Sequence, residues 1–242
     1  MDKKTIIIKE REARDRAEEH FFQCCGVQGL GDDFTAFYEE GLRIRDNCLA
    51  ELKISAVFSG YIPQIRSGSS MRIGGKDIEG EVFKRMSLEK VDLVYPYMIT
   101  VNKGKGIEGD RHLMYEYLVD LWETAYLYAG IDLVRAEVLR EAKRLVENGV
   151  FFVYGFAPGH YGMDLGENRK IDQILNGAAI GISVLDTGAM QPLKSCSGIF
   201  GVSKESLKWL PGFDIGVCKD CLGSPEGCVC CLRFTTLRHE QV

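Results

Sequence analysis

The sequence has no hydrophobic run long enough to cross a membrane. Its longest apolar stretches, residues 91–101 and 150–158, contain charge, proline or glycine and fall well short of the roughly 20 residues that a membrane-spanning helix needs. The start of the chain, MDKKTIIIKERE, provides only Ile6–Ile8 before charged residues resume, which is too short for the apolar part of a signal peptide. We therefore expect a cytoplasmic protein that is neither exported nor inserted into a membrane.

The sequence also lacks an excess of basic residues. It contains 30 lysines and arginines against 35 aspartates and glutamates, so its formal net charge is −5 at pH 7. Nucleic-acid-binding domains usually carry a basic face or stripe, and none is apparent in this sequence. We therefore expect no nucleic-acid partner.

Histidine is scarce, with 4 residues in a chain of 242. No histidine with an orienting acid is placed by spacing beside a candidate nucleophile, so the stretch Ser195-Cys196-Ser197-Gly198 does not by itself indicate acyl-transfer catalysis. A lone histidine such as His160 is more often a polar loop residue than a catalyst. Histidine chemistry alone therefore predicts no function.

The pattern of helix-forming and strand-forming segments predicts an α+β fold. Strands are expected at 54–58, 91–101, 151–156, 180–185 and 198–202, and helices at 9–25, 32–52, 77–86, 110–128, 131–148, 170–175 and 203–209. Gly130 is expected to separate two helices, and Pro96 to force a bulge or an edge position in its strand. The two glycines in residues 72–76 indicate a tight turn. Strands and helices do not alternate strictly, which argues against a doubly wound parallel sheet.

Two segments that contain glycine and proline are the most distinctive motifs. FAPGHYG, residues 156–162, follows a predicted strand, and its glycines can adopt positive φ angles and let a ligand approach the backbone. On its own this segment is explained as well by a connecting β-turn. The second segment, ISVLDTGAMQPLKSCSGIFGV, covers residues 182–202. The two have to be read together.

Together these segments resemble the reactivation domain of cobalamin-dependent methionine synthase, and more closely the free-standing proteins that carry that domain alone. In that family a Pro-Gly turn after a strand is followed by a short helix, a strand ending in Met-x-Pro, and a Ser-x-Ser-Gly strand. Here the matching segments are Pro158-Gly159, residues 170–175, Met190-Gln191-Pro192 and residues 195–198, in the same order. The resemblance covers about residues 74–232.

The resemblance implies a largely antiparallel mixed sheet flanked by helices. It also implies a division of the chain into a helical and strand segment (residues 1–73) packed on an activation-like core (residues 74–210), followed by a cysteine-rich tail (residues 211–242). It implies binding of S-adenosylmethionine and an encounter with a cobalamin-carrying protein. The expected ligand-binding residues are Gly155, Ala157, Pro158, Gly159, His160, Tyr161, Met190, Gln191 and Ser195.

Three of these positions depart from the family pattern. The family has an arginine three residues before the proline, a tyrosine directly after the glycine, and a second tyrosine before the later proline, all near the ligand. This chain has Gly155, His160 and Gln191 there. We expect His160 and Gln191 to lie on opposite walls of one groove, with His160 nearest the ligand.

Cysteines are concentrated near the end of the chain, where residues 218–231 hold five of the nine. In a reducing compartment such clusters are more often metal ligands or redox groups than disulfides. The predicted ligands are Cys218, Cys221, Cys228 and Cys231, with Cys230 as a substitute, because adjacent residues of an extended segment face opposite ways. Four thiolates suit a 4Fe-4S cluster or zinc. A mobile or oxidised tail, or direct thiol chemistry, stays open.

The predicted function is reactivation of a corrinoid protein. The chain would dock that protein and help restore its active cobalt state by delivering electrons, by supplying a methyl group from S-adenosylmethionine, or both, and an electron-donor protein would be a further partner. One alternative is a non-enzymatic corrinoid-protein binding module or chaperone with structural zinc. Another is a methyltransferase that acts on a small substrate.

Overall fold

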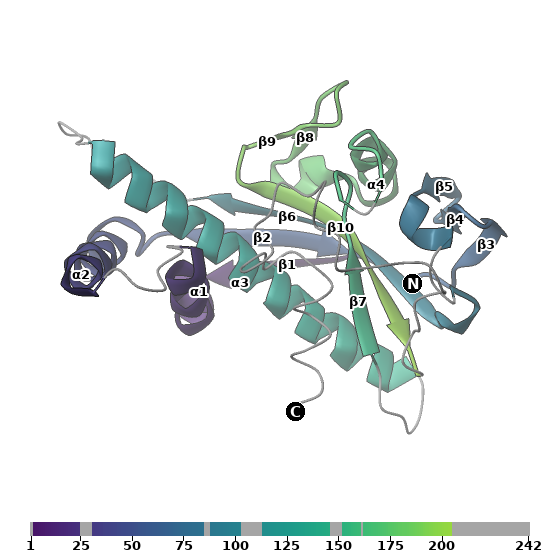
Figure 1. The fold of residues 1–242 in the computed structure, drawn as a ribbon. Helices are drawn as coiled ribbons and strands as arrows, with labels where there is room; N and C mark the ends of the chain where they lie inside the picture. Colours follow the sequence, from purple (N-terminus) through teal and green to yellow (C-terminus); the bar gives the residue numbers. More distant parts are fainter. Residues whose placement is uncertain are drawn as a thin grey trace.

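The protein is built around a five-stranded sheet. The computed structural model describes residues 2–24, 31–84, 88–102, 113–145, 152–160 and 162–204. The sheet has the order β1-β2-β6-β10-β7, and every neighbouring pair is antiparallel (Figure 1). The strands are β1 (Lys4–Lys9), β2 (Lys53–Phe58), β6 (Leu93–Asn102), β7 (Phe152–Phe156) and β10 (Ser195–Ser203). The predicted α+β class with a largely antiparallel sheet is confirmed.

Helices cover one face of the sheet, which we call the helix face. They are α1 (Glu10–Cys24), α2 (Gly31–Cys48) and α3 (Leu113–Leu145), and α3 runs across the strands (Figure 1). Helix α1 turns one stripe inward, because Ala13, Ala17 and Phe21 recur every four residues and are fully buried. Among the helices of the described residues, none is both long and apolar enough to cross a membrane.

Gly130 lies inside α3, so the predicted break between two helices is wrong. A Cβ atom at Gly130 would lie 2.7 Å from Ile99 Cδ1 and 2.8 Å from Ile54 Cγ2. Ile99 belongs to β6 and Ile54 to β2. The glycine therefore allows the helix to approach the sheet closely, rather than ending a helix.

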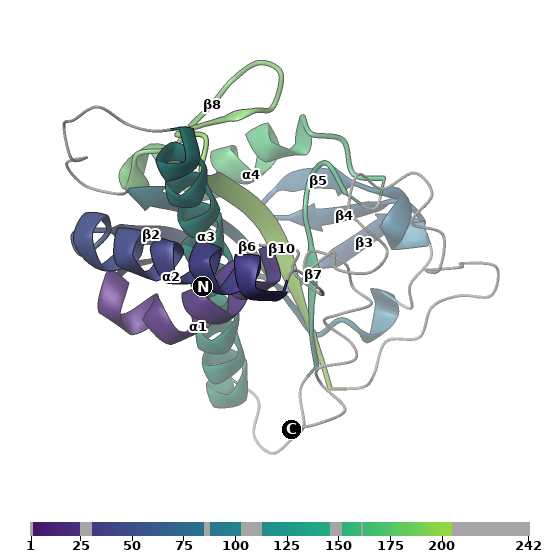
Figure 2. The ribbon, with the colours of Figure 1, turned by 60° about the vertical axis from the view of Figure 1, so that its left-hand side comes forward.

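Shorter elements cover the opposite face, which we call the loop face. They are β3 (Gln64–Ser67), β4 (Ser70–Ile73), β5 (Lys76–Glu79), α4 (Glu167–Leu175), the hairpin of β8 (Ser183–Val184) and β9 (Met190–Gln191), and the 3-10 helices η1 (Glu81–Lys84), η2 (Leu88–Lys90) and η3 (Gly177–Ile180). Figure 2 shows α4 and β3–β5 on the side of the sheet away from α1 and α2. A second apolar core, which includes Val57, Met98 and Ile171, lies between them and the sheet.

Two further predictions on this face are corrected by the structure. Residues 77–86 were expected to be helical, but they begin in β5, which pairs with β4 through a turn where Gly74 and Gly75 have φ angles of 55° and 83°. The turn predicted at residues 72–76 is thus confirmed, and the strand beyond it was missed. Alternating burial of Lys76–Glu79 against the second core favours the strand.

Pro96 occupies a central strand, so the predicted bulge or edge position is wrong. Strand β6 pairs with β2 on one side and β10 on the other in a regular register. The Pro96 carbonyl accepts a hydrogen bond from the Ser59 amide at 3.4 Å, one residue beyond the end of β2. In an antiparallel sheet the nitrogen and the carbonyl of one residue face the same neighbouring strand. The Pro96 nitrogen, which has no hydrogen to donate, therefore faces β2 at a point beyond its last residue, so no hydrogen bond within the β2–β6 pair is lost.

The first part of the chain contributes directly to the central sheet. Strands β1 and β2 both come from residues 1–73, and the boundary expected after residue 73 falls in the turn between β4 and β5. The division of the chain at this boundary stays a prediction. The tail at 211–242 lies beyond the described residues, which end at residue 204, and so do residues 205–209 of the helix expected at 203–209. The first residue of that expected helix, Ser203, is the last residue of β10.

Candidate functional site

The Pro-Gly motif forms a loop that is closed by its own backbone. The Gly159 amide donates to the Met163 carbonyl at 2.9 Å, the His160 amide to the Ala157 carbonyl at 3.1 Å, and the Met163 amide to the His160 carbonyl at 2.9 Å. Gly159 has a φ of 85°, which a side chain would strain. Pro158 is buried, Ala157 is half-buried, and Gly159 and His160 are exposed.

The closed loop rests on the loop-face core. Met163 is 3% exposed. The Glu81 amide at the start of η1 donates to the Gly162 carbonyl at 3.1 Å, and a Cβ atom at Gly162 would lie 2.6 Å from Glu81 Cβ. Both glycines of the motif are therefore required, Gly159 by its φ angle and Gly162 by its φ of 68° and this close approach.

The second motif forms the β8–β9 hairpin and the start of β10. Met190 is half-buried against the loop-face core, and Gln191 is exposed. The Ser195 hydroxyl donates to the Pro192 carbonyl at 2.6 Å and lies 2.9 Å from Thr100 Oγ1. These contacts fix the backbone between β9 and β10.

Lys194 anchors the same connection to the helix face. Its ammonium group donates to Thr124 Oγ1 at 2.8 Å and pairs with Asp120 Oδ1 at 2.8 Å, both on α3. The Lys194 carbonyl accepts a hydrogen bond from the Val101 amide at 3.0 Å. The segment that carries Gln191 and Ser195 is thus held from both faces of the sheet.

The two motifs meet at the start of α4. A Cβ atom at Gly188, in the β8–β9 turn, would clash with the Leu165 carbonyl oxygen, and one at Gly159 would lie 3.6 Å from Leu165 Cδ1. Leu165 therefore contacts both turns. The sequence prediction that the two motifs come together is supported by this packing, while a groove between His160 and Gln191 stays a prediction.

Two buried polar residues of α4 complete the junction, and sequence reasoning missed both. Asn168 is 2% exposed, and its Nδ2 donates to the Gly188 carbonyl at 2.8 Å while its Oδ1 accepts from Ser197 Oγ at 2.5 Å. Glu167 is 6% exposed and accepts from the Glu79 amide at 3.2 Å. No sequence pattern indicates them, because their partners, the Glu79 amide, the Gly188 carbonyl and Ser197 Oγ, are remote in the sequence.

The expected short helix at residues 170–175 is confirmed and begins three residues earlier, at Glu167. Lys170 reinforces its first turn, since its ammonium group lies 2.8 Å from Glu167 Oε1 and donates to the Asp77 carbonyl at 2.8 Å. The helix is amphipathic, with Ile171 and Ile174 directed into the loop-face core. Its first turn is thereby fixed to the β4–β5 hairpin as well as to β8–β9.

His160 is the titratable side chain of the Pro-Gly loop. The residue is exposed overall, but neighbouring protein atoms remove part of the hydration of its ring. This partial loss of hydration lowers the pKa of His160 below its usual value of 6.5. The ring is therefore neutral at pH 7. A neutral imidazole can donate and accept hydrogen bonds without repelling a bound cation.

Gly155 and Gly198 differ in what their missing side chains allow. A Cβ atom at Gly155, in β7, would lie 3.7 Å from Phe200 Cε1, which is an ordinary contact. At Gly198 it would lie 2.6 Å from the Phe156 carbonyl oxygen and 2.8 Å from the Tyr97 ring, which stacks on Phe200. Glycine is thus required at Gly198, whereas Gly155 has room for a side chain.

The predicted metal ligands Cys218, Cys221, Cys228, Cys230 and Cys231 lie outside the described residues, as does Tyr161. Within the part of the chain that the structure describes, no group of histidine, cysteine, aspartate and glutamate side chains could hold a metal ion. Cys196 is half-buried, and its Sγ donates to the Ser197 carbonyl oxygen at 3.5 Å.

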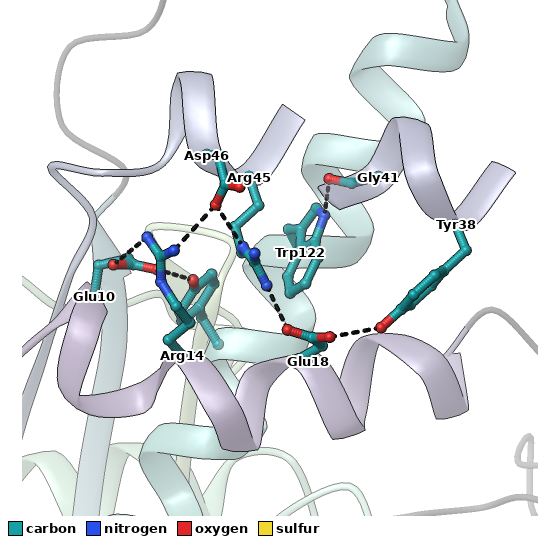
Figure 3. A network of polar contacts seen from close by, with 9 residues as sticks. Glu10, Arg14, Glu18, Tyr38, Gly41, Arg45, Asp46 and Trp122 are labelled. Carbon is teal, nitrogen blue, oxygen red and sulfur yellow. Dashed lines mark hydrogen bonds and ion pairs between the residues drawn. The ribbon is translucent and has the colours of Figure 1, made fainter. Parts of the chain in front are cut away.

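A charged network lies away from this junction, between the helices of the helix face (Figure 3). Arg45 pairs with Glu18 at 2.7 Å and with Asp46 at 3.0 Å, and its guanidinium lies 5.3 Å from the centre of the Trp122 ring. Arg14 pairs with Glu10 at 2.8 Å, and Glu10 also accepts the hydroxyl of buried Tyr126. Since its groups bind one another, the network fastens helices together.

Comparisons with known proteins support the fold. No family model matches the sequence, and no curated protein matches it. The structure is similar to a crystal structure of the MetH reactivation domain bound to AdoHcy, with a TM-score of 0.60 and 15% sequence identity. The match covers 85% of this chain and 80% of that chain. The fold that the two motifs predict is therefore confirmed.

Proposed function

We propose that this chain docks a corrinoid-carrying protein and helps return its cobalt to the active state. One observation carries the proposal: the two motif segments, remote in sequence, meet at Leu165 and Asn168 in a fold similar to that of a domain solved with AdoHcy. Domains of similar fold can differ in function. The proposal therefore rests on the junction of the motifs together with the fold.

The proposed ligand site lies at this junction and takes S-adenosylmethionine. Its residues would be those of the Pro-Gly loop and β7 on one side (Gly155, Ala157, Pro158, Gly159, His160 and Tyr161) and those of the hairpin and its exit on the other (Met190, Gln191 and Ser195). The neutral His160 ring suits a ligand that carries a positive sulfonium group. The loop, which is closed by its own backbone hydrogen bonds, would present main-chain groups to the ligand.

The reaction we propose joins a reduction to a methyl transfer. One electron reduces the partner's corrinoid from Co(II) to Co(I). The sulfur–methyl bond of S-adenosylmethionine then breaks, a cobalt–carbon bond forms, and S-adenosylhomocysteine leaves. The chain's own contribution would be to hold the methyl donor at the junction and to exclude water there. The electron would come from a donor protein in the cytoplasm or through the cysteine tail.

The tail cysteines would hold a 4Fe-4S cluster or zinc through Cys218, Cys221, Cys228 and Cys231, with Cys230 as a substitute. Four thiolates satisfy the ligand requirement of either centre. A cluster would supply the electron, whereas zinc would only fold the tail. Brown colour, broad absorption near 400 nm, iron and sulfide in the purified protein would support the cluster, and one zinc in a colourless protein would oppose it.

Calorimetric titration of the full chain with S-adenosylmethionine tests the proposal. Saturable binding at one site is expected, and it should be lost when Gly159 is replaced by valine, because a β-branched residue cannot adopt the φ of 85°. A matched control is Thr5→Val, a substitution to valine at an exposed position of the edge strand β1, which the ligand site does not include. Absence of binding by the wild-type chain would contradict the methyl-donor role.

A second candidate is a corrinoid-protein binding module without methyl transfer. It is favoured by Gly155, His160 and Gln191, which replace the arginine and two tyrosines of the family that the sequence resembles. In that case the chain would bind a corrinoid-carrying protein in a pull-down of purified components, and calorimetry would show no heat with S-adenosylmethionine. Turnover of S-adenosylmethionine without any corrinoid partner would instead indicate a small-substrate methyltransferase.

A further inference from the structure

Asn168 is the one side chain among the described residues that is hydrogen-bonded to both the β8–β9 hairpin and the central sheet at this junction. Its orientation is fixed by its partners. The Gly188 carbonyl can only accept a hydrogen bond, so the amide nitrogen of Asn168 must face it at 2.8 Å. The amide oxygen then accepts from Ser197 Oγ. Ser197 is 2% exposed and belongs to β10, which pairs with a strand on each side.

The Asn168 backbone is joined to the Pro-Gly loop by consecutive turns. The Asn168 amide donates to the Leu165 carbonyl at 3.1 Å, and the Glu167 amide donates to the Asp164 carbonyl at 3.1 Å. The Met163 carbonyl, just before these turns, accepts the Gly159 amide at 2.9 Å. A displacement of the loop therefore moves the Asn168 side chain, and through it the Gly188 carbonyl.

We infer that Asn168 is a positioning residue that makes the Pro-Gly loop and the β8–β9 hairpin one cooperative unit, so that a ligand bound by one segment orders the other. Leu165 keeps the two turns adjacent, with its side chain near Gly159 and its main-chain carbonyl against Gly188, but these are van der Waals contacts without direction. The directional link is the hydrogen bond between Asn168 and Gly188. This inference rests on the proposed function only where it concerns the ligand.

Amide hydrogen exchange of the full chain without ligand tests the coupling directly. Thr187→Gly loosens the hairpin by removing the hydroxyl that the Ala189 amide faces at 3.4 Å. In the wild-type background we expect this change to speed exchange about fivefold at Gly188 and also at Gly159 and Met163. Combined with Asn168→Asp, the Thr187→Gly change should speed exchange at Gly188 alone.

Asn168→Asp is the most selective variant. It keeps the shape of the side chain and the oxygen that accepts from Ser197, but it places a carboxylate oxygen, which cannot donate, opposite the Gly188 carbonyl. Protonation of the new carboxyl group restores a donor, so coupling should return as the pH falls from 8 to 6, since burial raises a carboxyl pKa. A merely structural role would give no such recovery. If this variant does not fold, Asn168→Ala replaces it in the exchange experiment.

Ligand binding provides the second arm. With AdoHcy as the probe, Asn168→Asp should weaken binding about tenfold at pH 8 and come within about twofold of the wild type at pH 6. Ser197→Ala keeps the bond to Gly188 and should weaken binding less than threefold. A wild-type chain that binds no AdoHcy would refute the proposed function, while the exchange experiment would still decide the inference. The inference is overturned if Thr187→Gly speeds amide exchange at Gly159 and Met163 in both the wild-type chain and the Asn168→Asp variant. It is also overturned if Thr187→Gly changes exchange at these amides in neither protein.

Discussion

The two faces of the sheet are held by different chemistry. On the helix face, ion pairs join α1 to α2, with Arg45 between Glu18 and Asp46 at 2.7 Å and 3.0 Å. On the loop face, the junction of the motifs is held mainly by hydrogen bonds to main-chain atoms, such as that from Asn168, and by glycines in close contact with backbone, such as Gly188. The candidate site is on the second face.

This difference predicts different responses to acid. The pKa of Glu18 is lowered by hydrogen bonds from Tyr38 and Arg45, and the pKa of Asp46 is lowered by the hydrogen bond from Arg45. Both carboxylates therefore stabilise the fold above their unfolded pKa values, and this contribution is lost as the pH falls through their folded values. The hydrogen bond from the Asn168 amide to the Gly188 carbonyl joins two neutral groups and does not titrate, so this link should persist at pH values where the ion pairs of the helix face weaken.

The largest effect is expected from Trp122→Ala on the helix face. Trp122 is fully buried, stacks on Phe21 with ring centres 3.9 Å apart, and donates to the Gly41 carbonyl at 2.7 Å. Its loss should lower the free energy of unfolding by about 3–5 kcal/mol, measured by circular dichroism in denaturant. Leu113→Ala, at an 81% exposed position of α3, is the control and should change it by less than about 0.5 kcal/mol. A small loss for Trp122→Ala would contradict the packing described here.

A smaller effect is expected from Arg45→Met. Removal of its two ion pairs and its contact with Trp122 should cost about 1–2 kcal/mol at pH 7. Because Asp46 then loses the partner that lowers its pKa, the loss of stability between about pH 4 and pH 2 should be shallower than in the wild type. Arg140→Met, whose side chain is 64% exposed, is the matched control and should leave both quantities nearly unchanged. If the free energy of unfolding of Arg45→Met falls as steeply between about pH 4 and pH 2 as that of the wild type, the stabilising role of these ion pairs is contradicted.

In the edge strand β7, Gly155→Arg should increase affinity for S-adenosylmethionine. A side chain at this position would leave the sheet on the helix-face side, beside Phe200, and the long arginine would pass the edge of the sheet to reach the ligand. The position has room, since its Cβ atom would lie 3.7 Å from Phe200 Cε1, and the family that the sequence resembles has arginine there. A charged hydrogen bond to the ligand carboxylate should strengthen binding about fivefold, or about 1 kcal/mol, by calorimetry. Gly155→Met tests whether bulk alone has the same effect. Equal gains from both variants would argue against a ligand carboxylate at this position.

The smallest expected effect is a pH-dependent preference at His160. Burial lowers the pKa of His160 from its ordinary value, so its ring becomes charged only as the pH falls through that lowered pKa. The cation should then repel the sulfonium of S-adenosylmethionine but not the neutral thioether of AdoHcy. The affinity for S-adenosylmethionine relative to that for AdoHcy should therefore fall about two- to fivefold. Parallel titrations at pH 7.5 and pH 5.5 measure this ratio. In His160→Gln the ratio should not change with pH, and a change that persists there would assign it to another group.

The sequence was informative where structure depends on local rules. The Pro-Gly turn, the glycines at residues 74 and 75, the strand at 54–58 and the first helix follow from neighbouring residues, and the structure confirms them. Gly130 shows where such rules fail. Local propensity reads a glycine inside a helical segment as a stop, but its role here depends on Ile54 and Ile99, which are remote in the sequence. Pro96 was misread for the same reason, because its tolerance depends on where β2 ends.

The candidate site was predictable to the same extent. The turns that carry Gly159 and Gln191 could be recognised because they depend on glycine and proline at fixed positions. Asn168 could not be recognised in this way, because its partners are a main-chain carbonyl twenty residues away and the hydroxyl of Ser197 in β10. Buried polar residues whose partners are main-chain atoms leave little pattern in a sequence.

Hydrogen exchange of the full chain with and without AdoHcy tests the central claim most directly. If the two motifs form one ligand site, saturating AdoHcy should slow exchange both at Gly159 and Met163 in the Pro-Gly loop and at Leu185 and Gly188 in the β8–β9 hairpin, while amides of α1 on the helix face stay unchanged. Slower exchange in only one of the two segments, or in neither, would contradict it.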